Sequence, residues 1–222
     1  DNHIADTADI SKKLELYEAN NIYDEYNNMM YSAVVKRIPC MTIVGDMPTF
    51  KGDEKTNVFK FEDTGNSVLN FTEEVDNDVQ GTSSQWYVRK NFKAKFSKEM
   101  TIAIGQIPTK VICLKADYAE GTSTHNTGSA NYCETLYDAP SPAQELDSRC
   151  RRTIFGYPIV VFHQATEADT PTFVGKYNLN YDKGSNEVYG FANFPKAERW
   201  EVLNNTNDLC LFKTEDLTKI AE

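Results

Sequence analysis

The sequence has no long hydrophobic runs, is poor in basic residues and histidine, and does not cluster its cysteines. No stretch approaches 18 apolar residues, which argues against a membrane-spanning helix. With 23 Lys and Arg against 33 Asp and Glu, the net charge is −10, and a nucleic-acid partner would require surplus cations. Three histidines and five cysteines without a C-x-x-C pair give no zinc-ligand spacing. We therefore expect no membrane span, no nucleic-acid partner and no metal site, with all five cysteines reduced.

Hydrophobic residues nevertheless make up 40% of the 222 residues, and aromatic residues 12%. This is enough to bury a core, so we expect a globular protein of one large domain or two small ones. The chain begins with Asp1 in place of Met and shows no signal or transit peptide pattern. We interpret it as a segment of a longer polypeptide.

Residues 1–35 are predicted to form a helical lead-in to the domain. Between residues 9 and 31, apolar positions such as Ile10, Leu14 and Met29 recur at spacings of three to five. Asp9 is a suitable N-cap. Such a helix would pack on the domain or on a neighbouring chain, and an independent function of this segment is the alternative.

Residues 36–222 are predicted to form an α+β domain, mainly an antiparallel sheet with a few packed helices. Alternation indicates strands: Phe92, Ala94 and Phe96 share one face, and Lys93 and Lys95 share the other. Strand follows strand before any further helix, which favours antiparallel pairing. The expected strands are residues 38–44, 58–62, 68–79, 91–96, 111–116, 157–163, 172–179 and 187–191 (after a turn at Gly184), with a last hairpin of 200–203 and 209–212, and the expected helical segments are 126–137 and 143–151.

The most informative stretch is residues 78–96, between two of these strands. A Gly-Thr-Ser-Ser turn at residues 81–84 is followed by four basic residues, Arg89, Lys90, Lys93 and Lys95. Backbone N–H groups and hydroxyls of such a turn, with lysines on the next strand, can hold an anion. The G-x-x-x-x-G-K-[ST] phosphate loop is absent. A plain turn before a solvated, lysine-bearing strand is the alternative interpretation.

A basic island occurs at residues 149–152, Arg-Cys-Arg-Arg. In an acidic chain, it is expected to form a salt-bridged or solvated turn, and a phosphate site is the alternative.

Residues 81–96 resemble the signature of the CotH-type atypical kinase family, first known from spore-coat proteins. That signature reads Gly-Asn-Ser-Thr-Trp, then Tyr-Pro-Lys-Lys-Pro-Tyr-Arg, and ends Lys-Phe. Residues 79–85, Val-Gln-Gly-Thr-Ser-Ser-Gln, are most similar to the CotH-like domains of phage and prophage structural proteins. The residues in step with the signature are Gly81, Ser83, Tyr87, Lys90, Lys95 and Phe96, with Arg89 and Lys93 as basic equivalents.

Three further segments follow the order of the family. Residues 38–45 resemble its opening strand, and residues 173–179 resemble its Phe-Leu-Gly-x-Tyr strand. Residues 114–136 are similar to the segment in which an Asn, here Asn126, opens a helix. The resemblance covers residues 38–212 and implies a CotH-kinase-like fold. It also implies a vestigial nucleotide- or anion-binding site at Gly81, Ser83, Lys90, Lys95 and Asn126.

The first functional hypothesis is a structural, virion-associated segment of a bacteriophage, in a tail, neck or capsid-associated protein. It would serve assembly or host attachment, without a cofactor, and its location would be the virion or, before assembly, the host cytoplasm. Its partners would be other virion proteins, further copies of itself and, for attachment, a host-surface receptor. This hypothesis rests on the resemblance, because a fold does not by itself imply a function.

Two alternatives belong to other classes. One is an ATP- and Mg²⁺-dependent protein kinase, which needs carboxylates for the metal and a group that orients the nucleophile. The family's metal carboxylates follow the Gly-x-Tyr strand, where this chain offers Asp182 and Glu187, or lie beyond Glu222. We expect no catalytic residue in this segment. The other alternative is a carbohydrate- or receptor-binding module in which Trp86 and Tyr87 stack on sugars, and a buried Trp86 at the sheet edge is the competing interpretation.

Overall fold

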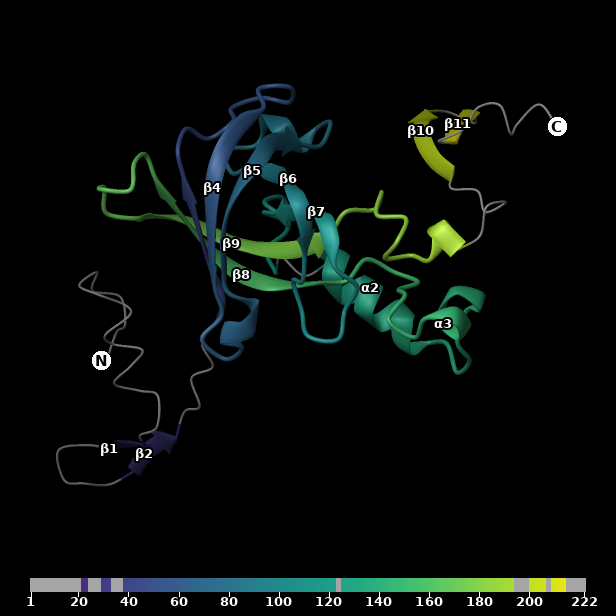
Figure 1. Cartoon of the computed structure of the whole chain (residues 1–222), viewed down its shortest axis with the longest axis horizontal. Helices are drawn as coiled ribbons and strands as arrows, with labels where there is room; N and C mark the ends of the chain where they lie inside the picture. Colours follow the sequence, from purple (N-terminus) through teal and green to yellow (C-terminus); the bar gives the residue numbers. More distant parts are fainter. Residues whose placement is uncertain are drawn as a thin grey trace.

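The computed structural model describes residues 38–122 and 125–193 with their side chains and the backbone of residues 21–23, 29–32, 200–206 and 209–214. Its centre is a closed β-barrel with the strand order β3-β4-β5-β6-β7-β9-β8 (Figure 1). The strands are β3 (Cys40–Val44), β4 (Lys55–Glu62), β5 (Phe71–Gln80), β6 (Asn91–Met100), β7 (Thr109–Lys115), β8 (Gly156–Gln164) and β9 (Thr172–Tyr181).

The barrel is mixed, because β3 and β8 run parallel while all other neighbouring strands in it are antiparallel. The β3–β8 pair, with Cys40 opposite Val160, closes the barrel. The expectation of largely antiparallel pairing is confirmed, and the α+β class is corrected to a mainly-β domain, a closed barrel with two short helices. The alternation of side chains shows that a strand exists, but it does not show which distant strand shares its edge.

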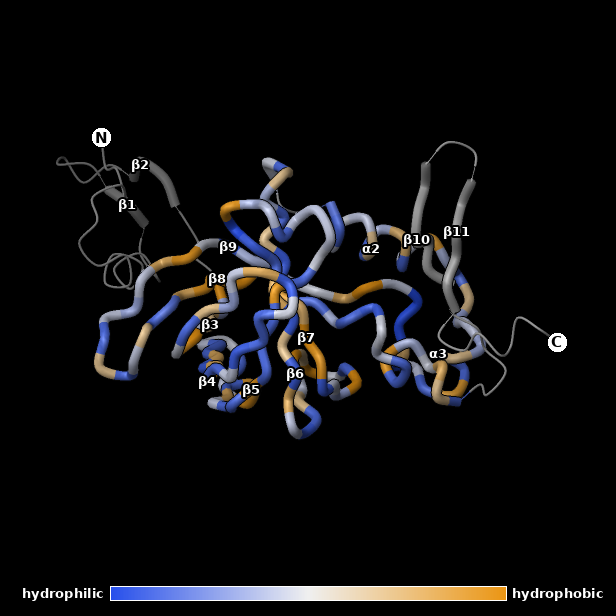
Figure 2. Tube along the Cα trace, turned by 90° about the horizontal axis from the view of Figure 1, so that it is seen from above, coloured by the Kyte–Doolittle hydropathy of each residue, from blue (hydrophilic) through white to orange (hydrophobic). Residues whose placement is uncertain are grey.

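Alternating side chains from the strands fill the barrel. On β6, Phe92, Ala94 and Phe96 are buried while Lys95 is exposed, as the sequence predicts. Hydrophobic segments run along β7 and β8 (Figure 2). Each large apolar side chain removed from water stabilises the fold by about 1.5–3 kcal/mol. The buried core includes Met41, Ile43, Phe59, Phe61, Val75, Val79, Phe92, Ala94, Ile112, Leu114, Ile159, Val161, Tyr177, Leu179 and Tyr181.

One rim of the barrel carries the sequence motif. Given the strand directions, this rim gathers the ends of β3, β5, β7 and β8 and the starts of β4, β6 and β9. The loop of residues 81–90 joins β5 to β6 there. Gly45 N donates a hydrogen bond to Gln164 O at 2.9 Å, and His163 Nε2 lies 2.8 Å from Gly45 O. These contacts tie β3 to β8 at this end of the barrel. We call this end, which carries the loop of residues 81–90, the Gly81 rim.

Two short helices, α2 (His125–Thr135) and α3 (Pro142–Leu146), lie outside the barrel (Figure 1). The helix predicted at residues 126–137 is confirmed over most of its length. α3 begins with a capping box, in which Ser141 and Gln144 each accept a backbone N–H of the other with their side chains. The helical turn predicted at residues 143–151 extends only to Leu146, because Asp147 is already extended. None of the helices in the described part of the chain combines the length and apolar character needed to cross a membrane.

The strand predicted at residues 187–191 is wrong. These residues form turns that lead into the 3-10 helix η3 (Phe191–Asn193). β9 is hydrogen-bonded to β7 on one side and to β8 on the other. It therefore has no free edge for a hairpin partner after Gly184.

The helix predicted at residues 9–31 is also wrong where the structure describes it. β1 (Asn21–Tyr23) and β2 (Met29–Ser32) form an antiparallel pair, and the remaining residues of the predicted helix lie outside the described part. Ile22, Tyr23 and Tyr31 favour strands, and apolar spacing over such short stretches does not separate a helix from a strand. The last predicted hairpin is confirmed as β10 (Trp200–Thr206) paired with β11 (Leu209–Thr214).

Candidate functional site

The loop of residues 81–90 has a fixed backbone. Gly81 has a φ of 110°, a region that favours glycine. A Cβ atom on Gly81 would overlap Ser84 Oγ, which lies 3.2 Å from Gln80 O as a hydrogen-bond donor. The 3-10 helix η2 (Ser84–Trp86) follows, with Ser83 as its N-cap residue. Gly81 therefore allows a tight turn in which the side chain of Ser84 packs against the backbone of residues 80 and 81.

Lys90 is bound by the carbonyl groups of its own loop. Its Nζ donates to Gln85 O at 2.7 Å and to Tyr87 O at 3.3 Å. Two backbone carbonyls of this loop thus accept hydrogen bonds from a cation, which are stronger than bonds between neutral groups. The sequence predicts that Lys90 contacts an anion, whereas in the structure its ammonium group stabilises the loop.

Lys95 lies apart from Lys90, farther along β6. It is exposed, and its Nζ lies 2.8 Å from Glu54 Oε2. The hydrogen bond to Glu54 raises the pKa of Lys95. The structure therefore places Gly81, Ser83 and Lys90 in one loop, while Lys95 pairs with an acidic residue of another loop.

Arg89 anchors the loop to the barrel. Its Nη2 donates to Ala116 O at 3.1 Å, and its guanidinium carbon lies 5.8 Å from the ring centre of Tyr118 and 5.9 Å from that of Tyr177. A Cβ on Gly175 would lie 2.8 Å from Arg89 Cδ. Arg89 therefore depends on a glycine in β9, and the sequence alone gives no signal that joins these two positions.

The tip of the loop is apolar and open to solvent. Trp86 is 80% exposed and Val88 is 88% exposed. The interpretation of Trp86 as a buried sheet-edge residue is wrong. Tyr87 is partly buried, and its ring centre lies 5.7 Å from that of Tyr118. The loop thus presents one indole ring and one valine on a backbone fixed by Arg89 and Lys90.

Asn126, the remaining predicted site residue, is connected to the same rim through hydrogen bonds. Asn91 Nδ2 donates to Ser84 Oγ at 3.1 Å, and Asn91 Oδ1 accepts from Ala116 N at 2.8 Å. The next residue, Asp117, accepts from Asn126 Nδ2 at 2.9 Å. Through these contacts, the start of α2 and the 81–90 loop meet at the end of β7.

Asp117 is a site residue that the sequence does not reveal. It has a φ of 44°, unusual for a residue other than glycine. Its two carboxylate oxygens accept from Asn126 Nδ2 and, at 2.7 Å, from Asn178 Nδ2. An Asp after a strand is too common in sequences to stand out, and Asn178 is far away in the chain. Strained backbone of this kind persists only where surrounding contacts fix it.

A second polar cluster lies on the outer face of β6, β7 and β9. Lys93 Nζ lies 2.9 Å from Asp182 Oδ2, a carboxylate that is mostly buried. Cys113 Sγ lies 3.5 Å from Asp182 Oδ1. Burial opposes the ionisation of Asp182, but the hydrogen bond and charge of Lys93 outweigh it, so the pKa of Asp182 is lowered. Burial and then the charge of Asp182 raise the pKa of Cys113 to about 12.

The described parts of the chain contain no group of three or more His, Cys, Asp or Glu side chains that could hold a metal ion. The cysteines with described side chains, Cys40, Cys113, Cys133 and Cys150, are free thiols, which confirms the expectation for these four. The basic island also behaves as expected, since Arg149 Nη2 lies 2.7 Å from Asp147 Oδ2.

No family model matches this chain, and no curated protein matches it.

Proposed function

We propose that this chain is a virion-associated structural domain of a bacteriophage, with a CotH-like fold, that contacts other virion proteins through the loop of residues 81–90. The resemblance of residues 81–96 to the CotH-like domains of phage structural proteins supports this assignment. The observation that carries it is the exposure of Trp86 and Val88 on a loop whose basic residues are engaged internally.

An exposed apolar pair on a fixed loop is suited to binding another protein. Arg89, Lys90 and Asn91 hold the backbone through hydrogen bonds to Ala116, Gln85 and Ser84. Little conformational entropy would be lost when such a loop is covered by a partner. Tryptophan is among the residues that contribute most to binding energy at protein interfaces.

The direct test is mass spectrometry of purified particles. Particles induced or propagated in the source organism and purified on a density gradient should contain peptides of this chain in fixed stoichiometry with known capsid or tail proteins. Peptides found only in the host cell lysate, and absent from particles, would contradict the proposal.

A variant pair tests the loop itself. Val88→Ser should reduce incorporation into particles, because it removes an apolar group from the proposed contact. Val68→Ser is the matched control, since Val68 is 79% exposed and lies in a different turn, η1 (Ser67–Leu69). Equal incorporation of both variants would exclude the loop as the contact surface.

The exposure of Trp86 also favours a second candidate, the carbohydrate- or receptor-binding module. An indole ring open to solvent can stack on the apolar face of a sugar. A glycan array probed with the full chain and with Trp86→Ala separates the two roles. Loss of a specific glycan signal in the variant would favour receptor binding, whereas no signal for either protein would leave the assembly role.

The kinase hypothesis has less support. The ammonium groups of Lys90 and Lys95 are held by protein oxygens, and Asp182 is paired with Lys93. Calorimetric titration of the full chain with Mg-ATP, beside Lys90→Ala, tests it. Micromolar binding that the variant loses would favour a kinase-like site over a purely structural domain.

A further inference from the structure

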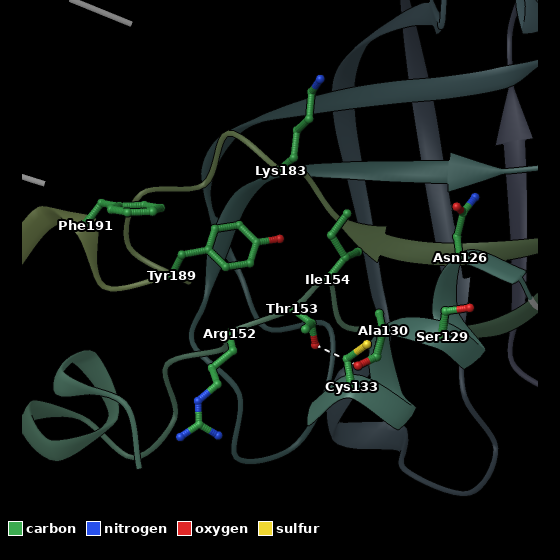
Figure 3. A pocket seen from close by; sticks show the side chains of 10 residues that line it. All are labelled: Asn126, Ser129, Ala130, Cys133, Arg152, Thr153, Ile154, Lys183, Tyr189 and Phe191. Atoms are coloured by element: carbon green, nitrogen blue, oxygen red, sulfur yellow. Dashed lines mark hydrogen bonds between the residues drawn. The ribbon is translucent and has the colours of Figure 1, made fainter. Parts of the chain in front are cut away.

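An open cavity of about 430 Å³ lies beside α2. It is bounded by α2, by residues 152–154 before β8 and by residues 183–191 after β9. Its size falls within the range of sites for small molecules. The lining residues are Asn126, Ser129, Ala130, Cys133, Arg152, Thr153, Ile154, Lys183, Tyr189 and Phe191 (Figure 3).

The charge of this cavity is opposite to that of the chain. The whole chain carries a net charge of −10, yet the described residues that line the cavity include two cations, Lys183 and Arg152, and no carboxylate. Lys115 is close enough to interact electrostatically with Lys183, and also with the carboxylates of Asp117 and Asp182. The adjacent carboxylate of Asp182 is already paired with Lys93. The charged side chains of the lining therefore favour an anion over a cation.

Glu134 of α2 does not reverse this charge. Its Oε2 accepts a hydrogen bond from Thr153 Oγ1 at 2.8 Å and lies 3.9 Å from Arg151 Nη2. Burial opposes ionisation of Glu134, but Thr153 and then Arg151 outweigh it, so its pKa is lowered. The carboxylate is thus balanced by a hydroxyl donor and a guanidinium group, outside the lining of the cavity.

The interior of the cavity is mainly apolar. Figure 3 shows the rings of Tyr189 and Phe191 on one side and Ala130 and Cys133 of α2 on the other, with Ile154 between them. Lys183 and Arg152 stand at opposite margins, with their charged ends directed outward. Arg152 also packs over the ring of Tyr137, 4.6 Å from its centre. The arrangement offers an apolar middle with cations at the margins.

We propose that this cavity binds a small organic anion, consisting of a single aromatic ring with a carboxylate or phosphate group. The ring would lie between Phe191 and α2, and the anionic group would lie at the margin near Lys183, where it stays in contact with water. The volume accommodates one ring with its anionic group. This inference does not depend on the proposed role in a virion, and either can fail alone.

Cys133 provides a reporter inside the cavity. Its thiol is exposed, whereas Cys113 and Cys150 are buried. Iodoacetamide labelling of the full chain, followed by peptide mapping, measures its reactivity with benzoate, phenyl phosphate or benzylamine present. At about ten times the dissociation constant, the bound anion should slow labelling of Cys133 about tenfold. Benzoate and phenyl phosphate distinguish the two anionic groups, and the cation benzylamine should give no protection.

Two variants with matched controls test the assignment by calorimetry. Lys183→Met should weaken binding of the protecting anion about fivefold, as for a partly exposed ion pair, whereas Lys98→Met removes an equal charge elsewhere and should not. Ser129→Trp should block the cavity, whereas Asn131→Trp adds the same ring to the same helix outside the lining. Absence of protection by both anions, or equal protection by benzylamine, would overturn the proposal.

Discussion

Ser84 Oγ occupies the space that a Cβ atom on Gly81 would need. The hydroxyl group lies there because it bonds to Gln80 O and accepts from Asn91 Nδ2. The glycine that opens the sequence motif is thus required by the loop's own geometry. A glycine at this place does not by itself indicate a bound phosphate.

Gly81→Ala should destabilise the fold by about 2–3 kcal/mol, since the φ of 110° strains any Cβ and the overlap with Ser84 adds to that strain. Urea denaturation followed by circular dichroism measures the change. Two controls separate the causes. Gly105 has a φ of 73°, but a Cβ atom there would contact no other atom, so Gly105→Ala should cost about 1 kcal/mol. A Cβ atom on Gly121 would also contact nothing, so Gly121→Ala should be nearly neutral. Equal losses of unfolding free energy for Gly81→Ala and Gly105→Ala would show that Ser84 moves away and that the overlap with the new Cβ atom adds nothing.

Lys90→Met should open the 81–90 loop. The variant keeps the side-chain length but removes the donor to Gln85 O and Tyr87 O. The expected loss is about 1–2 kcal/mol, with faster proteolysis within the loop. Lys95→Met, which removes only an exposed ion pair with Glu54, should cost at most about 1 kcal/mol. Unchanged proteolysis of the Lys90 variant would mean that the loop does not depend on this ammonium group.

The pair of Lys93 and Asp182 should make stability depend on acid pH. The pKa of Asp182 is lower in the folded than in the unfolded chain, so its contribution is present above the unfolded value of about 3.9. That contribution is lost as the pH falls through the lower, folded value. The free energy of unfolding, measured from pH 7 down to pH 2, should decrease in this window.

Lys93→Met tests that assignment. At pH 7 it leaves a buried carboxylate without its cation and should cost about 2–3 kcal/mol, less than for a fully buried pair because the Lys93 side chain is 33% exposed. As the pH falls through the lowered pKa of Asp182, the carboxylate loses its charge, so the difference between the two proteins should shrink toward acid pH. Lys98→Met, whose partner Glu73 forms a more exposed pair, is the control. A difference that does not change with pH would exclude the ion pair as its cause.

The cysteines should react in an order set by burial. Cys113 is buried and has a pKa of about 12, so little thiolate forms at pH 8. Cys133 is exposed and should be alkylated first among the four described cysteines. Peptide mapping after timed treatment with iodoacetamide measures the order. Labelling of Cys113 as fast as Cys133 in the folded protein would contradict the buried contact with Asp182.

Much of the barrel could be predicted from local patterns. The alternation of Phe92, Ala94 and Phe96 with Lys93 and Lys95 correctly predicted where β6 lies and which of its side chains are buried. Closure was not predictable in the same way, because Cys40 pairs with Val160 on a strand far away in sequence. The strand predicted at residues 187–191 was wrong for the same reason, because pairing between distant strands decides it. Only the closed barrel shows that both edges of β9 are already paired.

The candidate site was predictable only in part. The sequence placed Gly81 and Ser83 in one turn and Lys90 just after it, and such closeness along the chain is a local property. It did not indicate that Lys90 would bind its own loop, because a lysine's partner depends on the path of the chain around it. Asp117 was missed for a related reason, since its importance lies in contacts with Asn126 and Asn178 from separate elements.

Asp117 should stabilise the junction of β7, β9 and α2 in spite of its strained backbone. Asp117→Ala removes the acceptors of both asparagine amides, and Asn178 is buried. An unsatisfied buried amide costs about 1–3 kcal/mol, and the Cβ atom keeps the strain of the φ of 44°. The expected loss, measured by urea denaturation, is therefore at least about 2 kcal/mol.

Asp117→Gly separates the strain from the hydrogen bonds. It deletes the same carboxylate but relieves the positive φ, so it should be more stable than Asp117→Ala by about 1 kcal/mol. It should still be less stable than the natural chain, because Asn178 Nδ2 loses its hydrogen bond to Asp117 Oδ2. If Asp117→Gly were instead more stable than the natural chain, the carboxylate would be there at a net cost to the fold. Its retention would then point to a bound partner at this end of β7, since strain without a structural return is typical of functional sites.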